Sequence, residues 1–149
     1  MYENWKIEDW RTPVSDIEGL QMVSLCDDNR SLAIIVQGLI DPVRRRFRIS
    51  FNQYPAYRNI NESYRNELWN VLSKNVGKWG RTFIVTASPW IESFSKETLL
   101  FNHPEITHYV ICTEDDVIEV LSPEPPEIAE IEPAAEREEL PGKSEIYWK

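Results

Sequence analysis

The chain has 149 residues and a mass of 17.5 kDa, with 25 acidic residues against 16 basic ones, a formal net charge of −9 and a pI near 4.8. This length suits one domain, which buries enough surface to fold without disulfides or metals. The apolar fraction of 42% and the six tryptophans exclude a disordered chain, and no apolar run approaches the roughly 18 residues of a membrane span.

The N-terminus reads MYENWKIEDWRTP and carries acidic side chains where a secretory signal would carry basic ones. We therefore expect a cytoplasmic protein. Cys26 and Cys112 lack the spacing of a zinc site, so we expect two buried, reduced thiols and neither a metal nor a cofactor.

Three strands are predicted early in the chain, because apolar or alternating runs are separated by the turn-forming segments DDNR and IDPV. These runs span residues 20–26, 31–39 and 44–52. Side chains alternate along a strand, so Phe47, Ile49 and Phe51 share one face of the third run, and Arg46 and Arg48 share the other.

A helix is predicted next, with Asn59 as its N-cap. Tyr64, Leu68 and Leu72 would then lie on one apolar stripe, and the glycines near residue 80 would end the helix. The run 81–88 is apolar on both faces, which is typical of a covered central strand.

The remaining body elements are a shorter helix over residues 90–101 and two strands over 106–113 and 117–121. We expect an α+β fold, in which two helices cover one face of a twisted, mostly antiparallel sheet of about five or six strands.

A change of composition near residue 122 predicts a domain over residues 1–122 and an extended acidic Pro/Glu-rich tail over 123–149. The tail holds eight acids and three bases, a net charge of −5, so the body carries only −4 of the total. Tyr147 and Trp148 near the end of the tail would either fold back on the body or present a short binding motif.

The arginines of the run 44–52 interrupt an otherwise acidic sequence. Arg44, Arg46 and Arg48 would form a row on one strand face, able to bind phosphate or RNA. The row could equally pair with the protein's own glutamates, including those of the tail, and the acidic total argues against a nucleic-acid binder.

Two acidic turns, at Asp27 and Asp28 and at Asp115 and Asp116, have the composition of solvated hairpin tips rather than of a metal loop. If both lay at the same end of the sheet, they would form one negative rim. Such a rim would suit a basic partner.

Tyr57 and Arg58 are predicted to lie on a connection between a strand and a helix, where binding residues often occur. His108 is expected in a strand as a half-buried histidine. No phosphate-binding glycine motif or nucleophile motif is present in the sequence.

The favoured functional hypothesis is a cytoplasmic protein-interaction module without catalysis and without membrane contact. Its partner would be another protein, and in the narrower version of the hypothesis a basic protein that it inhibits. The layout is similar in kind to small acidic bacterial proteins, some of which are immunity proteins that inhibit toxins; the similarity is one of size, charge and architecture. An alternative is a small-ligand-binding protein or minor enzyme with a pocket between sheet and helices, lined by Tyr57, Arg58, His108 and Arg48.

Overall fold

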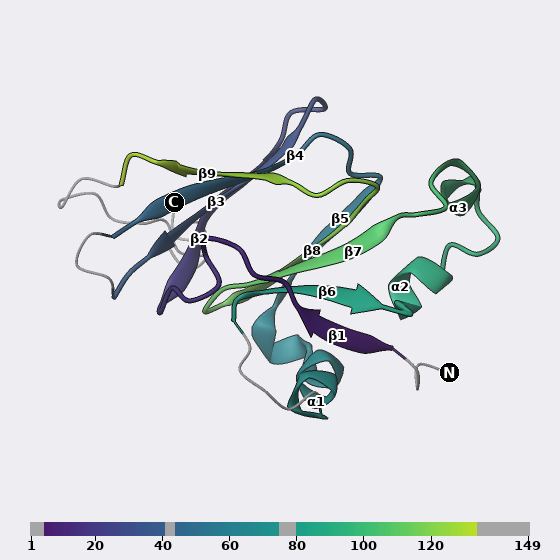
Figure 1. Cartoon of the computed structure of the whole chain (residues 1–149), viewed down its shortest axis with the longest axis horizontal. Helices are drawn as coiled ribbons and strands as arrows, with labels where there is room; N and C mark the ends of the chain where they lie inside the picture. Colours follow the sequence, from purple (N-terminus) through teal and green to yellow (C-terminus); the bar gives the residue numbers. More distant parts are fainter. Residues whose placement is uncertain (1–4, 41–43, 75–79, 134–149) are drawn as a thin grey trace.

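The computed structural model describes residues 5–40, 44–74 and 80–133. In this part of the chain, nine strands form two antiparallel sheets (Figure 1). The prediction of mainly antiparallel strands with few helices is confirmed, whereas the prediction of a single sheet is wrong.

The first sheet has five strands in the order β1-β6-β7-β8-β5. Their bounds are β1 Lys6–Asp9, β5 Ala56–Asn61, β6 Thr82–Thr86, β7 Thr107–Cys112 and β8 Asp116–Ser122. The central strands β7 and β8 are almost entirely buried, because the sheet is covered on both faces.

The second sheet has four strands in the order β2-β3-β4-β9. Their bounds are β2 Leu20–Asp27, β3 Leu32–Gly38, β4 Arg46–Phe51 and β9 Glu127–Ile131. Strand β9 lies within the predicted tail and pairs with β4 along its whole length, for example Ile49 opposite Ile128.

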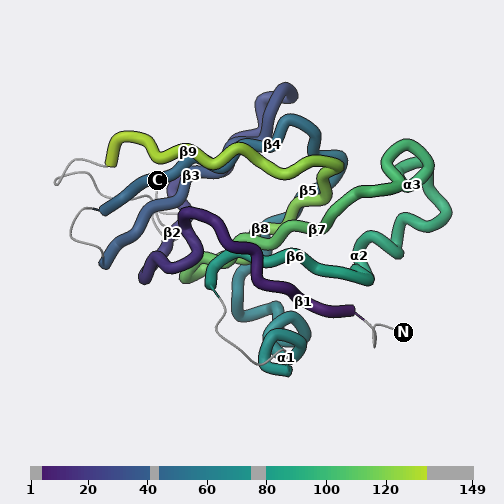
Figure 2. The backbone as a smooth tube through the Cα atoms, viewed as in Figure 1, coloured from purple at the N-terminus to yellow at the C-terminus, as the bar shows by residue number. Residues whose placement is uncertain are grey.

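The chain crosses from the second sheet to the first at the turn after β4. Figure 2 follows the backbone as it leaves β4 and enters β5, which pairs with β8 of the first sheet instead of with β4. Alternation of side chains reports which face of a strand is buried but not which strand lies beside it, so the periodicity could not separate one sheet from two.

A core between the two sheets joins the inner faces of β2, β3 and β4 to those of β7 and β8. Phe47, Ile49 and Phe51 are buried there, as their alternation predicts, and they pack with Tyr109 and Ile118 from the first sheet. The two sheets therefore share one hydrophobic core.

The other face of the first sheet is covered by the helix α1, Asn66–Lys74. Leu68 and Leu72 on its predicted stripe are buried against Phe83 and Val110. The predicted start of this helix is wrong: β5 continues to Asn61, which caps a short 3₁₀ turn at Glu62–Tyr64.

Where one helix was predicted over residues 90–101, the structure has two shorter helices after the end of β6. They are α2 at Pro89–Glu92 and α3 at Thr98–Asn102. Neither contains a buried residue, and in Figure 1 they project beyond the ends of β6 and β7 rather than covering the sheet. Among the described residues, no helix is long and apolar enough to cross a membrane.

Candidate functional site

A buried carboxylate organises the face of the first sheet that carries α1. Glu119 lies in the middle of β8 and is completely inaccessible to solvent. An ionised carboxylate in such a position is costly unless charged partners and hydrogen bonds surround it. We call Glu119 and its three partners, Arg58, Arg65 and His108, the Glu119 cluster.

Arg58 on β5 stands directly across from Glu119 in the strand pairing. It makes a bidentate ion pair, with Nε donating to Oε2 at 2.9 Å and Nη2 to Oε1 at 3.1 Å. Arg65, in the turn before α1, donates from Nη2 to Oε1 at 3.1 Å. Two arginines therefore converge on one carboxylate from different elements.

His108 on β7 completes the cluster, and its Nε2 lies 2.9 Å from Oε1 of Glu119. A carboxylate only accepts hydrogen bonds, so Nε2 carries the proton and Nδ1 accepts from the Ser88 hydroxyl at 2.7 Å. Burial lowers the pKa of His108, against the opposing effect of Glu119, so the ring is neutral at pH 7.

The pKa of Glu119 reflects the same contacts. Burial alone would raise it, but hydrogen bonds from His108 and Arg58 and the charges of Arg58 and Arg65 lower it to about 2. Glu119 is therefore ionised under physiological conditions, and the cluster has a net charge of +1 from two arginines and one carboxylate.

The segment before α2 fixes the outer side of the cluster. Ser88 caps α2 by accepting from the Ile91 backbone N–H at 3.2 Å. Trp90 of α2 lies over Arg58, with the guanidinium carbon 4.1 Å from the ring centroid, and meets the His108 ring edge-on at 5.2 Å. The Arg58 guanidinium is thus held by a carboxylate on one side and an aromatic ring on another.

A cleft of about 310 Å³ opens onto this cluster, and we call it the arginine cleft. Its apolar lining consists of Trp5, Pro89 and Trp90. Its polar lining consists of Arg58, Arg65, Glu67, Ser93 and His108. An apolar wall with a few convergent polar groups, at about 300 Å³ or more, is typical of small-molecule sites.

Ser88, His108 and Glu119 form a hydrogen-bonded chain of the kind that activates a serine nucleophile. Ser88, however, is only 5% exposed and does not line the arginine cleft, and its Oγ already caps α2. These hydrogen bonds therefore hold His108 in one tautomer, and they do not present the Ser88 hydroxyl to a ligand as a nucleophile.

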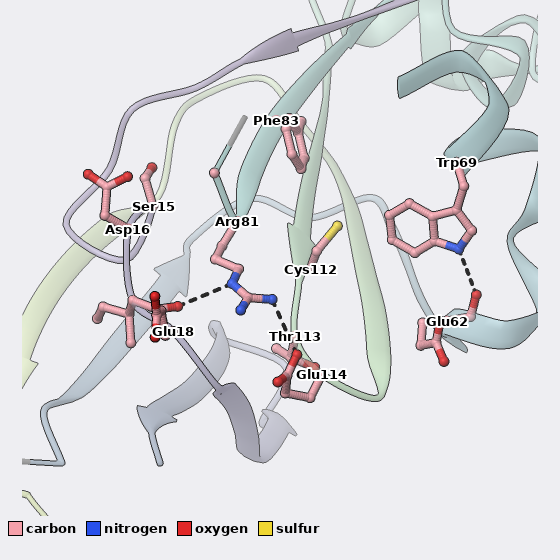
Figure 3. Close-up of a pocket in the computed structure, with 12 residues that line it drawn as sticks. Ser15, Asp16, Glu18, Glu62, Trp69, Arg81, Phe83, Cys112, Thr113 and Glu114 are labelled. Carbon is pink, nitrogen blue, oxygen red and sulfur yellow. Dashed lines mark hydrogen bonds and ion pairs between the residues drawn. The ribbon is translucent and has the colours of Figure 1, made fainter. Parts of the chain in front are cut away.

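A larger cleft of about 500 Å³ lies at the other end of β6 and β7 (Figure 3). Its arginine, Arg81, points to Glu114 at 3.4 Å and to the Ile17 carbonyl at 3.1 Å, so its donors are directed at the protein. Burial raises the pKa of its thiol, Cys112, to about 12, which keeps the sulfur protonated and unreactive. We regard the smaller arginine cleft as the better candidate because its polar groups converge.

Tyr57 and Asp27, both candidate binding residues from the sequence, lie together on the surface. The Tyr57 hydroxyl donates to Asp27 at 3.1 Å, and that of Tyr54 donates to the same carboxylate at 2.5 Å. Tyr57 is in the edge strand β5 and not on a connection. Asp28 accepts from the backbone N–H groups of Arg30 and Ser31, as expected for a turn residue.

The two acidic turns do not form a common rim. The turn after β7 lies beside the start of β2, because the Glu114 N–H donates to the Leu20 carbonyl at 2.8 Å, whereas Asp27 ends that strand. Seven residues of strand separate the turns by about 23 Å, at ~3.3 Å per residue. Asp115 is exposed, but Asp116 is buried in β8 instead of being solvated as expected.

The arginines of β4 point to different surroundings. Arg48 is exposed, while Arg46 is partly buried and donates to Gln37 at 2.6 Å. Their neighbour Arg45 pairs with Glu130 of β9 at 3.1 Å, which is one contact between the basic run and a glutamate of the predicted tail. Tyr147 and Trp148 lie outside the described residues.

The sequence associates Arg58 and His108 with one pocket, but it does not point to Glu119, which binds both of them. The signal was present: in the strand DVIEVLS, Glu119 is a charge in the middle of the run 117–121, whose other residues are apolar and face both ways. A charge in a strand buried on both faces must have a partner, which could have prompted a search for arginines. Ser88 and Trp90 carried no comparable signal, because they lie at the start of a short helix.

The chain matches no protein-family model, no curated protein and no solved structure at a significant level. Function is therefore inferred from the geometry of the arginine cleft alone.

Proposed function

We propose that this protein binds a small ligand in the arginine cleft. The observation that carries the proposal is the convergence of Arg58, Arg65 and His108 on one cleft of about 310 Å³, each held by the buried Glu119. Two of these residues, Arg58 and His108, are among the four that the sequence associates with a pocket between sheet and helices.

Preorganisation supports binding over a purely structural role. The Arg58 guanidinium is fixed by two hydrogen bonds to Glu119 and by the ring of Trp90. A side chain that is already immobile loses little entropy when a ligand binds to it. A network that served stability alone would not need to place its arginines and its histidine along an open cleft.

The test is a ligand-detected NMR screen with a mixed library of anionic, cationic and neutral fragments. Ser93 lines the cleft and is exposed, so Ser93→Trp places a large side chain in it without disturbing the core. Ser95→Trp, two residues away and exposed but outside the cleft, is the matched control.

We expect fragments that bind the wild type and the Ser95→Trp variant and lose at least tenfold in affinity with Ser93→Trp. Thermal unfolding of the three proteins verifies that each is folded. If no fragment binds the wild type, or if Ser93→Trp leaves every affinity unchanged, the proposal is wrong.

The protein-interaction hypothesis and the arginine-row hypothesis stay predictions. The first relied on acidic turns that lie about 23 Å apart along β2, at ~3.3 Å per residue. The second relied on a row in which Arg48 is exposed but Arg46 is turned to Gln37.

A further inference from the structure

We infer that the ligand of the arginine cleft carries an oxyanion, a carboxylate or a phosphate, which binds to Arg58 and Arg65. This inference rests on the proposed function and adds the chemical class of the ligand. It depends on three observations: which hydrogen-bonding groups of the cluster are already used, what charge remains, and what surrounds the arginines.

Both carboxylate oxygens of the cluster are already engaged. Oε1 of Glu119 accepts from Arg58, Arg65 and His108, and Oε2 accepts from Arg58. The carboxylate is also inaccessible to solvent. It therefore offers nothing to a ligand that would donate hydrogen bonds or carry a positive charge.

Donors remain on both arginines. A guanidinium has five N–H groups, and Arg58 uses only Nε and Nη2, so its Nη1 donates no hydrogen bond within residues 5–40, 44–74 and 80–133. Arg65 donates from Nη2, and within the same residues its Nη1 donates no hydrogen bond. Because these donors are unused, a group rich in hydrogen-bond acceptors is the complement that this cleft lacks.

The charge at the base of the cleft agrees with the donor count. Two arginines and Glu119 leave +1 next to a neutral His108. The other ionisable group of the cleft lining is Glu67, at the exposed start of α1, where water screens its charge. Arginine forks match the two oxygens of a carboxylate or phosphate, which favours an oxyanion over a halide.

The apolar lining of the cleft indicates which chemical group the ligand carries beside its oxyanion. Trp5 and Trp90 line it beside the arginines, so a small apolar or aromatic body attached to the oxyanion would remain in contact with them. Benzoate and phenyl phosphate are the two probes of this shape, one for each source of the oxyanion. Benzamide and benzylamine have the same ring without the negative charge.

The experiment measures the affinity of the four probes by calorimetry, first at one ionic strength for all probes and then at rising salt concentrations. We expect benzoate or phenyl phosphate to bind at least tenfold more tightly than benzamide, and benzylamine to bind most weakly. The stronger of the two anions identifies the source. Its affinity should fall as the salt concentration rises, while that of benzamide should not.

Variants assign the effect to the cleft. Arg65→Gln should reduce the affinity for the anion at least tenfold and leave benzamide unchanged, whereas Arg48→Gln, which removes an exposed strand arginine, should change neither. Arg65→Lys keeps the charge but loses the fork, and it provides a second variant if Arg65→Gln does not fold.

The outcomes separate the two proposals. Benzamide and benzylamine could bind as tightly as the anions and lose their affinity in the Ser93→Trp variant. In that case the oxyanion inference is wrong while the binding function stands. The inference is also wrong if the anions bind but Arg65→Gln and Arg65→Lys leave their affinity unchanged. If no probe and no library fragment binds, the proposed function itself is wrong.

Discussion

At the scale of single residues, Glu119 is the side chain on which the site depends. It has no contact with solvent, yet it is ionised, and four hydrogen bonds from three side chains compensate for its burial. A buried ion pair adds little stability over an apolar replacement of the same volume. Removing one partner is costly, because the remaining charges stay buried.

We therefore predict that Glu119→Gln lowers the free energy of unfolding by about 3–5 kcal/mol, because Arg58 and Arg65 keep their charges without a counter-ion. Urea unfolding followed by circular dichroism measures the change. Glu130→Gln is the control, since Glu130 and Arg45 form an exposed pair worth about 0–1 kcal/mol. Similar losses in the two variants would contradict this account.

The same cluster predicts a pH dependence. Burial holds the pKa of His108 below its ordinary value of 6.5, so the unfolded chain takes up the proton first, and stability falls as the pH drops below 6.5. The pKa of Glu119 is lowered to about 2 from 4.5, so its contribution is present above pH 4.5 and is lost as the pH falls toward 2. Both groups therefore make the protein less stable in acid.

Between pH 7.5 and pH 5.5, we expect the unfolding free energy to decrease with a slope of up to about 1.4 kcal/mol per pH unit for one proton. His108→Gln should remove most of this slope. His103→Gln changes the other histidine, at the end of α3, and should keep it. A slope that survives His108→Gln would show that another group causes it.

At the scale of elements, β9 shows how a segment with a tail-like composition becomes part of a sheet. Its residues are rich in glutamate and are followed by proline, but all five pair with residues of β4, and Ile128 and Ile131 are partly buried. Ile128 packs against the core between the sheets, and Glu130 pairs with Arg45. The acidic side chains point outward and protect the edge of the sheet from further pairing.

We predict that Ile128→Ala lowers the unfolding free energy by about 1–2 kcal/mol, since a partly buried isoleucine loses apolar contact area. Glu127→Gln, an exposed change in the same strand, should lie within about 0.5 kcal/mol of the wild type. Chemical denaturation of both variants measures the difference. No loss with Ile128→Ala would mean that β9 does not contribute to the folded sheet.

At the scale of the whole molecule, the first sheet separates the core between the sheets from the site. One face of β7 and β8 presents Tyr109 and Ile118 to the second sheet. The opposite face carries His108, which lines the cleft, and the buried Glu119 that binds it. The cleft therefore rests on two central strands that are hydrogen-bonded on both sides. Such strands are among the last parts of a protein to open.

The reactivities of the two cysteines test whether the central strands of the first sheet are closed to solvent. Cys26 is exposed, contrary to the expectation of two buried thiols, whereas Cys112 is buried in β7 and its pKa is raised to about 12. We predict that a thiol reagent labels one cysteine of the native protein quickly and the second only at the rate of unfolding. The Cys26→Ser variant should then show the slow phase alone; rapid labelling of this variant would contradict a closed core.

Much of the local structure could be predicted from the sequence, because side-chain alternation is a property of the strand itself. The buried face of β4 follows directly from it, as do Leu68 and Leu72 on the apolar stripe of α1, and the run of apolar residues in β6 predicts its covered position. Asn59 misled the prediction of the helix start, because asparagine caps a turn as readily as a helix, and here Asn61 does so.

The sequence by itself determined which side chains of β4 face inward and which side chains of α1 form its apolar stripe, and it places Glu119 among the apolar residues of β8. Only the tertiary structure decided that β5 leaves β4 for β8, which places Arg58 opposite Glu119 and brings His108 and Arg65 to the same carboxylate. The physical reason is that alternation depends on neighbours along the chain. Strand pairing instead depends on contacts between segments far apart in sequence, for which the backbone hydrogen bonds are the same whichever strand is the partner.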